Sequence, residues 1–153
     1  MKMLVQRVKY AKVSVEGKTT GEIEQGFLVL LGIAPEDTQE IMEKMVDKLL
    51  RLRIFSDEND KINLSLSDVG GSLLLVSQFT LYADCRKGNR PSFVHAAPPA
   101  QAEALYESCK AYCRERVPVV ESGIFGADMQ VSLVNEGPCT IVIDTDEWHK
   151  GEK

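Results

Sequence analysis

The chain has 153 residues, of which 44% are hydrophobic and 27% charged, and a formal net charge of −5. This length fits one domain with its own core, and the acidic balance argues against indiscriminate nucleic-acid binding, whose affinity comes mainly from phosphate neutralisation. No apolar run approaches the roughly 20 residues that span a bilayer, and no signal peptide is evident at the N-terminus, so we expect a cytoplasmic protein with no membrane partner.

The first part of the chain combines strand and helix patterns. Strands are predicted at 4–10, 13–15, 19–23 and 26–33, and a helix from about 37 to 52. Residues 26–33 are continuously apolar, which indicates a strand buried on both faces. Residues 37–40 form a capping-box-like helix start with Glu40 in the fourth place, and a polar connection follows at 56–61.

The second part of the chain contains more strands and another helix. Strands are predicted at 72–79, 119–125, 129–134 and 140–143, and a helix from Pro98-Pro99 to a stop at Pro118. Residues 83–99 form a long loop, a length that is usually functional in compact domains. The polar residues from Asp144 onward are expected to fray. We predict an α+β fold: one small domain over 1–145, a curved sheet or open barrel with two packed helices, and a polar tail at 146–153.

The four cysteines do not form a recognisable metal-binding pattern. Cys109 and Cys113 lie one turn apart on the second predicted helix, whereas Cys85 and Cys139 are isolated. A zinc site needs four ligands at characteristic spacing, and the two histidines, His95 and His149, are poorly placed to supply them. We therefore expect buried free thiols, and we expect neither a metal nor an organic cofactor.

Basic residues gather in two places despite the acidic total. One cluster lies in the long loop (Arg86, Lys87 and Arg90) and the other on the second helix (Lys110, Arg114 and Arg116). Either cluster is compatible with a nucleic acid that is held locally. A solvated surface explains the helical cluster better than it explains the loop cluster.

Two short segments at strand ends carry the candidate chemistry. Ser77–Leu81 follows an apolar strand, and Asn135–Thr140 contains a Gly-Pro pair before another strand. Backbone N–H groups near Gln78 and Phe79 are suited to hold a developing oxyanion, and the Thr80 hydroxyl is suited to attack or to orient water. A turn explains these residue types equally well. A serine-hydrolase triad is not supported, because no Gly-x-Ser-x-Gly elbow or suitable histidine is present.

Several motifs in register resemble the D-aminoacyl-tRNA deacylase family. The opening segments Gln6–Val8 and Gly21–Ile23 fit this family, and so do Ser77–Leu81, Lys87–Phe93, Ala127–Leu133 and Asn135–Thr140. The resemblance covers residues 1 to about 143 in the same order and at compatible spacing. Several motifs together are specific, although each one alone is weak.

The resemblance implies an enzyme of translation quality control that hydrolyses the ester between a D-amino acid and tRNA. It also implies activity on mischarged glycyl-tRNA, and a homodimer with its active sites at the interface. Ser77, Gln78, Phe79 and Thr80 would then be catalytic. Gly137-Pro138 would be a Gly-cisPro element that enters the partner's pocket and excludes L-side chains, Arg7 would brace it, and Met129 would lie where the terminal adenosine is held.

A rigid backbone surface of this kind would exclude an L-amino acid by steric clash with its side chain, without contacting the side chain of a D-amino acid.

The catalytic step leaves two mechanisms open. In one, Thr80 attacks the ester and a covalent intermediate forms; in the other, the 2′-hydroxyl of the terminal ribose and backbone amides carry the reaction. We favour the second, because no candidate base lies beside Thr80 in the sequence.

Three other classes of protein remain as alternatives. A non-catalytic tRNA- or nucleic-acid-binding module is disfavoured by the acidic balance. A structural dimer gives no reason for a Gly-Pro wall opposite Ser77–Thr80. A small-molecule esterase is the nearest rival, and D-amino acid esters that lack tRNA would separate it from a deacylase.

Overall fold

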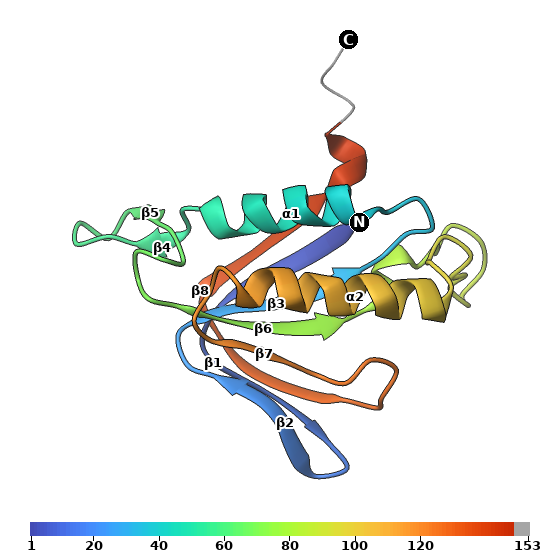
Figure 1. Cartoon of the computed structure of the whole chain (residues 1–153), viewed down its shortest axis with the longest axis horizontal. Coiled ribbons are helices and arrows are strands. Elements are labelled where there is room, and N and C mark those ends of the chain that lie inside the picture. The colour runs from blue at the N-terminus through green and yellow to red at the C-terminus, as the bar shows by residue number, and fades with distance from the viewer. Residues whose placement is uncertain (149–153) are drawn as a thin grey trace.

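The computed structural model describes residues 1–148 and contains a curved sheet with two helices (Figure 1). The main sheet contains β1 (Lys2–Val15), β2 (Lys18–Ile23), β3 (Gly26–Gly32), β6 (Ser72–Ser77), β7 (Val120–Ser122) and β8 (Gln130–Asp144). The helices are α1 (Gln39–Arg51) and α2 (Pro99–Arg114), and a small hairpin is formed by β4 (Phe55–Ser56) and β5 (Ile62–Leu64). Short 3₁₀ helices span Phe79–Tyr82 and Thr145–Glu147.

The main sheet is mixed and nearly closed. Its order is β2-β1-β3-β6-β7, and β8 pairs antiparallel with the other edge of β1. The β3–β6 and β6–β7 pairs are parallel. β2 approaches β7 closely, since the Thr20 hydroxyl donates to the Ser122 carbonyl at 3.4 Å. The predicted α+β fold, with a curved sheet and two helices, is therefore confirmed.

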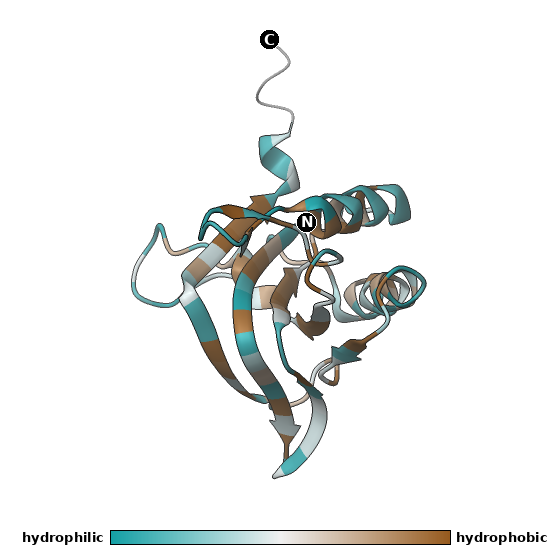
Figure 2. Ribbon diagram, turned by 90° about the vertical axis from the view of Figure 1, so that its left-hand side faces the viewer, coloured by the Kyte–Doolittle hydropathy of each residue, from teal (hydrophilic) through white to brown (hydrophobic). Residues whose placement is uncertain are grey.

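The central strands bury both faces, which explains their continuous apolar sequence. On β3, Phe27 and Val29 belong to the core beneath the helices, whereas Leu28 belongs to a second core on the opposite face. β6 alternates in the same way, with Leu73 facing the first core and Leu74 the second. Figure 2 shows brown and teal segments alternating along the long outer strands, as expected for strands with one solvated face.

Both helices lie on one side of the sheet (Figure 1). α1 buries Met42, Met45, Val46 and Leu49, and α2 buries Ala102, Leu105, Tyr106, Cys109 and Cys113. The Tyr112 hydroxyl of α2 donates to Asp47 of α1 at 2.9 Å. The Tyr106 hydroxyl donates to the buried Leu75 carbonyl at 2.8 Å, which fixes α2 on β6.

The predicted start of α1 is corrected by one residue. Thr38 is the N-cap, and its hydroxyl accepts from the Ile41 N–H at 3.2 Å. Asp37 is used elsewhere: its carboxylate accepts from the Ala34 N–H at 2.7 Å and from the Met1 ammonium at 2.8 Å. The capping-box interpretation of residues 37–40 was therefore wrong.

Several strand boundaries also differ from the prediction. The break expected near residues 11–12 does not exist, because β1 is continuous, and β6 ends at Ser77. The strands predicted at 129–134 and 140–143 form one strand, β8, since Asn135–Thr140 stays within it as an irregularity of the β1–β8 register.

The end of the described chain is attached to its beginning. Asp144 belongs to β8, the buried Thr145 accepts from the Met1 ammonium at 2.8 Å, and Trp148 packs against the core. The expected fraying is therefore wrong for residues 144–148. The remainder of the predicted tail, 149–153, lies outside the described residues. Within residues 1–148, no helix has the length and apolar composition needed to cross a membrane.

The cap of α1 gives a first prediction. Thr38→Ala removes the acceptor for the Ile41 N–H, so the free energy of unfolding should fall by about 1 kcal/mol. Thr38→Ser keeps a hydroxyl oxygen at the same place and should retain most of the stability. Urea denaturation of both variants tests this, and equal losses for Ala and Ser would contradict the capping role.

Candidate functional site

An apolar cavity of about 500 Å³ lies beside the end of β6. Ser77, Gln78 and Phe79 form part of its wall. The rest comes from the end of β3, the long loop, the start of α2 and the segment before β8: Leu31, Ile33, Phe93, Val94, Ala96, Ala97, Pro98, Pro99, Ala102, Phe125 and Gly126. The cavity therefore brings together four separate stretches of the chain, within 31–33, 77–79, 93–102 and 125–126.

The backbone turns sharply after β6 and leaves two amide groups available. The Gln78 N–H donates to the Leu31 carbonyl at 2.8 Å, so it is already used within the sheet. Within residues 1–148, the N–H groups of Phe79 and Thr80 have no hydrogen-bond acceptor. Of the backbone N–H groups near Gln78 and Phe79 that the sequence indicated, that of Gln78 is thus already paired, whereas those of Phe79 and Thr80 are unpaired within residues 1–148.

Thr80 is exposed and does not line the apolar cavity. Its hydroxyl accepts from the side-chain amide of Gln78. Among the described residues, no histidine or carboxylate forms a hydrogen bond with this hydroxyl. An amide N–H is a donor and cannot take a proton from threonine, so the surroundings of Thr80 do not activate it as a nucleophile.

Two aromatic rings form one rim of the cavity. Phe79 and Phe93 meet edge to face with their ring centroids 5.0 Å apart. Phe79 is 56% exposed, which is unusual for a large apolar side chain held in a defined contact. Exposed aromatic faces next to an apolar cavity are suited to stack on a base or on an aromatic amino acid.

The Gly137–Pro138 bond is cis, as the family resemblance implied, and the backbone around it is held by side chains. The buried Arg7 donates through Nε and Nη2 to the Glu136 carbonyl at 3.1 and 2.9 Å, and through Nη1 to the Ile54 carbonyl at 2.6 Å. Asn135 accepts from the Cys139 N–H at 2.8 Å. Gly137 has φ +128°, and a Cβ there would lie 2.7 Å from Arg7 Nη2, so this position requires glycine.

The two predicted segments are not brought together within one chain. Ser77 pairs with Leu31, which pairs with Met3, whereas Gly137 lies opposite the Gln6–Val8 part of β1. Three strand spacings and four to five residues of rise therefore separate them, about 20 Å along the sheet. Both Gly137 and Pro138 are exposed on β8.

Met129 is half-buried at a different place from the cavity lining. It packs against the second core, and a Cβ on Gly123 would lie 2.4 Å from its sulfur, so the side chain covers Gly123 closely. Phe125 and Gly126 of the same segment do line the cavity. Met129 thus does not line the cavity, although it covers Gly123 two residues before Phe125.

A second, more polar cavity of about 760 Å³ shares one lining residue, Val94, with the first. Its lining includes Tyr82, Asp84, Arg86 and His95. Hydrogen bonds from Arg86 hold the pKa of the Asp84 carboxyl well below its usual range, so this ion pair persists at neutral pH.

The four cysteines differ in how deeply they are buried. Cys109 and Cys113 are buried on α2, as expected, but Cys85 is exposed and Cys139 is half-buried, so the expectation of four buried thiols was wrong. Hydrogen bonding with Cys113, together with burial, raises the pKa of the Cys109 thiol. Within residues 1–148, no group of three or more His, Cys, Asp or Glu side chains could hold a metal ion.

Part of the cavity wall was not predicted as site residues. Phe93 and Val94 lie in or next to a motif that carried the family resemblance, and Pro98-Pro99 was recognised only as a helix start. Phe125 was assigned to a strand, although it lies in the connection between β7 and β8. The sequence feature that could have pointed to Phe93 and Val94 as site residues is the length of the loop at 83–99, because long loops in compact domains are often functional.

Comparisons with known proteins give consistent matches over nearly the whole chain. The family model for D-Tyr-tRNA(Tyr) deacylase matches residues 4–144. A D-aminoacyl-tRNA deacylase of Thermosipho africanus is 56% identical over 145 residues, covering 95% of this chain and 97% of that protein. The corresponding protein of Herpetosiphon aurantiacus is 52% identical over 151 residues, covering 99% of both.

Solved structures resemble this fold closely. A structure described as c-Myc DNA Unwinding Element Binding Protein has a TM-score of 0.89 and 45% identity, covering 95% of this chain and 99% of that one. A probable eukaryotic D-amino acid tRNA deacylase has a TM-score of 0.79 at 20% identity, covering 93% and 97%, and this match supports the fold alone.

The hydrogen bonds of Arg7 generate a second prediction. Arg7→Lys cannot reproduce three directed N–H donors, so the free energy of unfolding should fall by about 2 kcal/mol, and amide exchange of Cys139 should accelerate. Arg53→Lys is the matched control, since this guanidinium also donates to a backbone carbonyl, that of Asn63, but is exposed. Denaturation and hydrogen exchange by NMR measure both effects; an Arg7→Lys protein as stable as Arg53→Lys would contradict the role.

Proposed function

The chain belongs to the D-Tyr-tRNA(Tyr) deacylase family, and we propose that it hydrolyses the ester between a D-amino acid and the 3′ end of tRNA. Water replaces the ribose oxygen at the ester carbonyl, and the products are the free D-amino acid and tRNA. The observation that carries this proposal is the apolar cavity lined by Ser77, Gln78 and Phe79, together with the N–H groups of Phe79 and of the next residue, Thr80, both unpaired in the described part of the chain. Its volume of about 500 Å³ suits a small aminoacyl group.

The N–H groups of Phe79 and Thr80 are the proposed oxyanion donors. Attack on an ester places negative charge on the carbonyl oxygen, and fixed amide donors stabilise that charge without reorganising. The Gln78 N–H stays in its bond to Leu31, and this bond holds the turn that orients the next two amides. Ser77 and Gln78 therefore act mainly as positioning residues in this proposal.

We favour a mechanism in which the substrate's own 2′-hydroxyl assists the reaction. The Thr80 hydroxyl has no neighbouring base, it is exposed, and it already accepts a hydrogen bond from Gln78. An unactivated threonine is a weak nucleophile. The vicinal hydroxyl of the terminal ribose is supplied by every tRNA substrate at the reacting ester.

Gly137–Pro138 is the proposed chirality filter. The Glu136 carbonyl before it accepts hydrogen bonds from two N–H groups of Arg7. The Cys139 N–H after it donates to the side chain of Asn135. A backbone held in this way offers a rigid surface that collides with the side chain of an L-amino acid. Glycine has no side chain to collide, so glycyl-tRNA is also a substrate in this proposal.

The filter and the cavity are proposed to meet between two copies of the chain. They lie about 20 Å apart along the sheet of one copy, too far for both to contact one aminoacyl group. The outer edge of β8 pairs with no described strand and exposes Val131, Val134 and Val142, which are 37%, 52% and 62% exposed. An unpaired edge with exposed apolar side chains favours association, so a homodimer would complete each site.

The remaining substrate contacts follow from the same arrangement. Met129, held over Gly123 beside Phe125 and Gly126, is the proposed contact for the terminal adenosine. The exposed ring of Phe79 is available to stack on the same base.

A tRNA substrate implies that the enzyme works in the cytoplasm, where translation takes place.

One rival function follows from the structure that is described as a DNA-unwinding-element binding protein. A DNA-binding role needs many phosphate contacts, which the net charge of −5 disfavours. A general esterase is the other rival. Hydrolysis of D-tyrosyl-tRNA but not of free D-tyrosine ethyl ester would separate the proposed function from both.

The chirality filter makes a third prediction. The purified chain should hydrolyse D-tyrosyl-tRNA at least a hundredfold faster than L-tyrosyl-tRNA, equivalent to about 2.7 kcal/mol of barrier, and should also hydrolyse glycyl-tRNA. Release of the labelled amino acid measures all three rates. Equal rates on the D- and L-forms would contradict the filter, and inertness toward glycyl-tRNA would contradict selection by collision.

The catalytic step makes a fourth prediction. Thr80→Ala should lower kcat by no more than about tenfold, or about 1.4 kcal/mol, whereas loss of a true nucleophile costs several decades. A tRNA that ends in 2′-deoxyadenosine and carries D-tyrosine on its 3′-hydroxyl should bind but react slowly. Full activity on this substrate together with an inactive Thr80→Ala protein would reverse the choice of mechanism.

A further inference from the structure

The loop between Asp84 and Ser92 is held in a defined shape next to the candidate site. The two residues exchange backbone hydrogen bonds, from the Asp84 N–H at 2.7 Å and from the Ser92 N–H at 2.9 Å. Residues 85–91 are all exposed beyond this bridge. Gly88 reverses the chain at φ +63° with no neighbouring atom around it, so the loop projects into solvent.

The charge of this loop is opposite to that of the whole chain. No acidic residue occurs between Cys85 and Ala102, whereas Arg86, Lys87 and Arg90 are basic and the net charge of the chain is −5. Arg86 is compensated by its ion pair with Asp84 at 2.7 Å. Lys87 and Arg90 form no ion pair with any residue of the described part, so two full positive charges stay at the end of the loop.

The loop is attached directly to the rim of the apolar cavity. Arg90 precedes Phe93 by three residues, a backbone reach of at most about 10 Å, and Phe93 packs on Phe79. The first residues of α2 line the same cavity, and this helix has no side-chain N-cap. The positive end of its dipole therefore adds to the attraction for an anion on this side of the molecule.

We infer that Lys87 and Arg90 bind backbone phosphates of the tRNA 3′ end, so that the loop guides the charged end of tRNA into the cavity. This inference rests on the proposed function. A projecting loop with two uncompensated charges suits a flexible, repeatedly charged strand, because each phosphate contact releases counterions without requiring a particular base. It also explains how an acidic protein can bind an acidic substrate, since the positive charge is concentrated beside the site.

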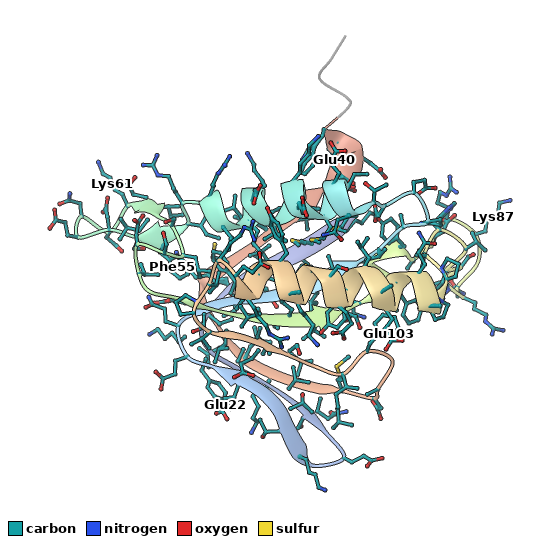
Figure 3. The ribbon with its side chains drawn as sticks, in the orientation of Figure 1. Glu22, Glu40, Phe55, Lys61, Lys87 and Glu103 are labelled. Carbon is teal, nitrogen blue, oxygen red and sulfur yellow. The ribbon has the colours of Figure 1, made fainter. Side chains whose placement is uncertain are left out.

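The test compares Lys87→Gln/Arg90→Gln with Lys18→Gln/Lys61→Gln, which loses the same formal charge at two exposed lysines elsewhere. Figure 3 shows Lys61 at the opposite end of the molecule from Lys87. Affinity for uncharged tRNA is measured by fluorescence anisotropy from 50 to 400 mM salt. The slope of log Kd against log salt should become shallower by about 1.4 for the loop variant, 0.7 for each single-strand phosphate contact, and should keep its wild-type value for the control.

A kinetic measurement separates guidance from a structural defect. The ratio of kcat/KM on D-tyrosyl-tRNA to that on D-tyrosyl-adenosine, which has no phosphate, should fall more than tenfold in the loop variant at 50 mM salt. An unchanged slope and ratio would overturn the inference while wild-type hydrolysis still supported the proposed function. A wild-type protein that binds tRNA but hydrolyses no D-aminoacyl-tRNA would overturn the proposed function instead.

Discussion

The buried guanidinium of Arg7 is the interaction on which the arrangement around Gly137–Pro138 depends. It lies on β1, donates twice to the carbonyl that precedes Gly137, and reaches the Ile54 carbonyl beyond the end of α1. A charged group is costly to bury without partners, and here every partner is a backbone carbonyl rather than a carboxylate. Arg7 therefore links the sheet, the helical layer and the irregular part of β8 at one point.

The pairing of β1 with β8 places the Gly137–Pro138 element away from the apolar cavity within one chain. β8 follows β1 from Asp144 back to Gln130, so Asn135–Thr140 is held on the outer edge of the sheet. The cavity lies on the other side of β1, at the end of the parallel β3–β6 pair. One chain thus carries the apolar cavity at one place and the exposed Gly137–Pro138 element at another, and this separation is the physical reason to propose a site shared by two copies.

The sequence predicted much of this architecture because the decisive signals were local. The unbroken apolar run at 26–33 indicated a central strand, and the helical spacing of Met45 and Leu49 indicated α1. The sequence did not predict that Asn135–Thr140 stays within one strand. Gly weakens a strand and Pro is confined to edge strands, strand starts and bulges, so the pair was placed before a new strand, whereas pairing with β1 keeps β8 continuous. The sequence also could not predict that the Gln78 N–H donates to the Leu31 carbonyl, because this hydrogen bond joins residues 47 positions apart.

The shared site is the central claim, and a crystal structure with a non-hydrolysable amide analogue of D-tyrosyl-adenosine tests it most directly. The account predicts that the aminoacyl group occupies the cavity beside Phe79, with its carbonyl oxygen about 3 Å from the N–H groups of Phe79 and Thr80. It also predicts that Gly137–Pro138 of a second copy contacts the α-carbon of the ligand. A ligand bound by a single copy, with Gly137–Pro138 of both copies facing solvent, would contradict it.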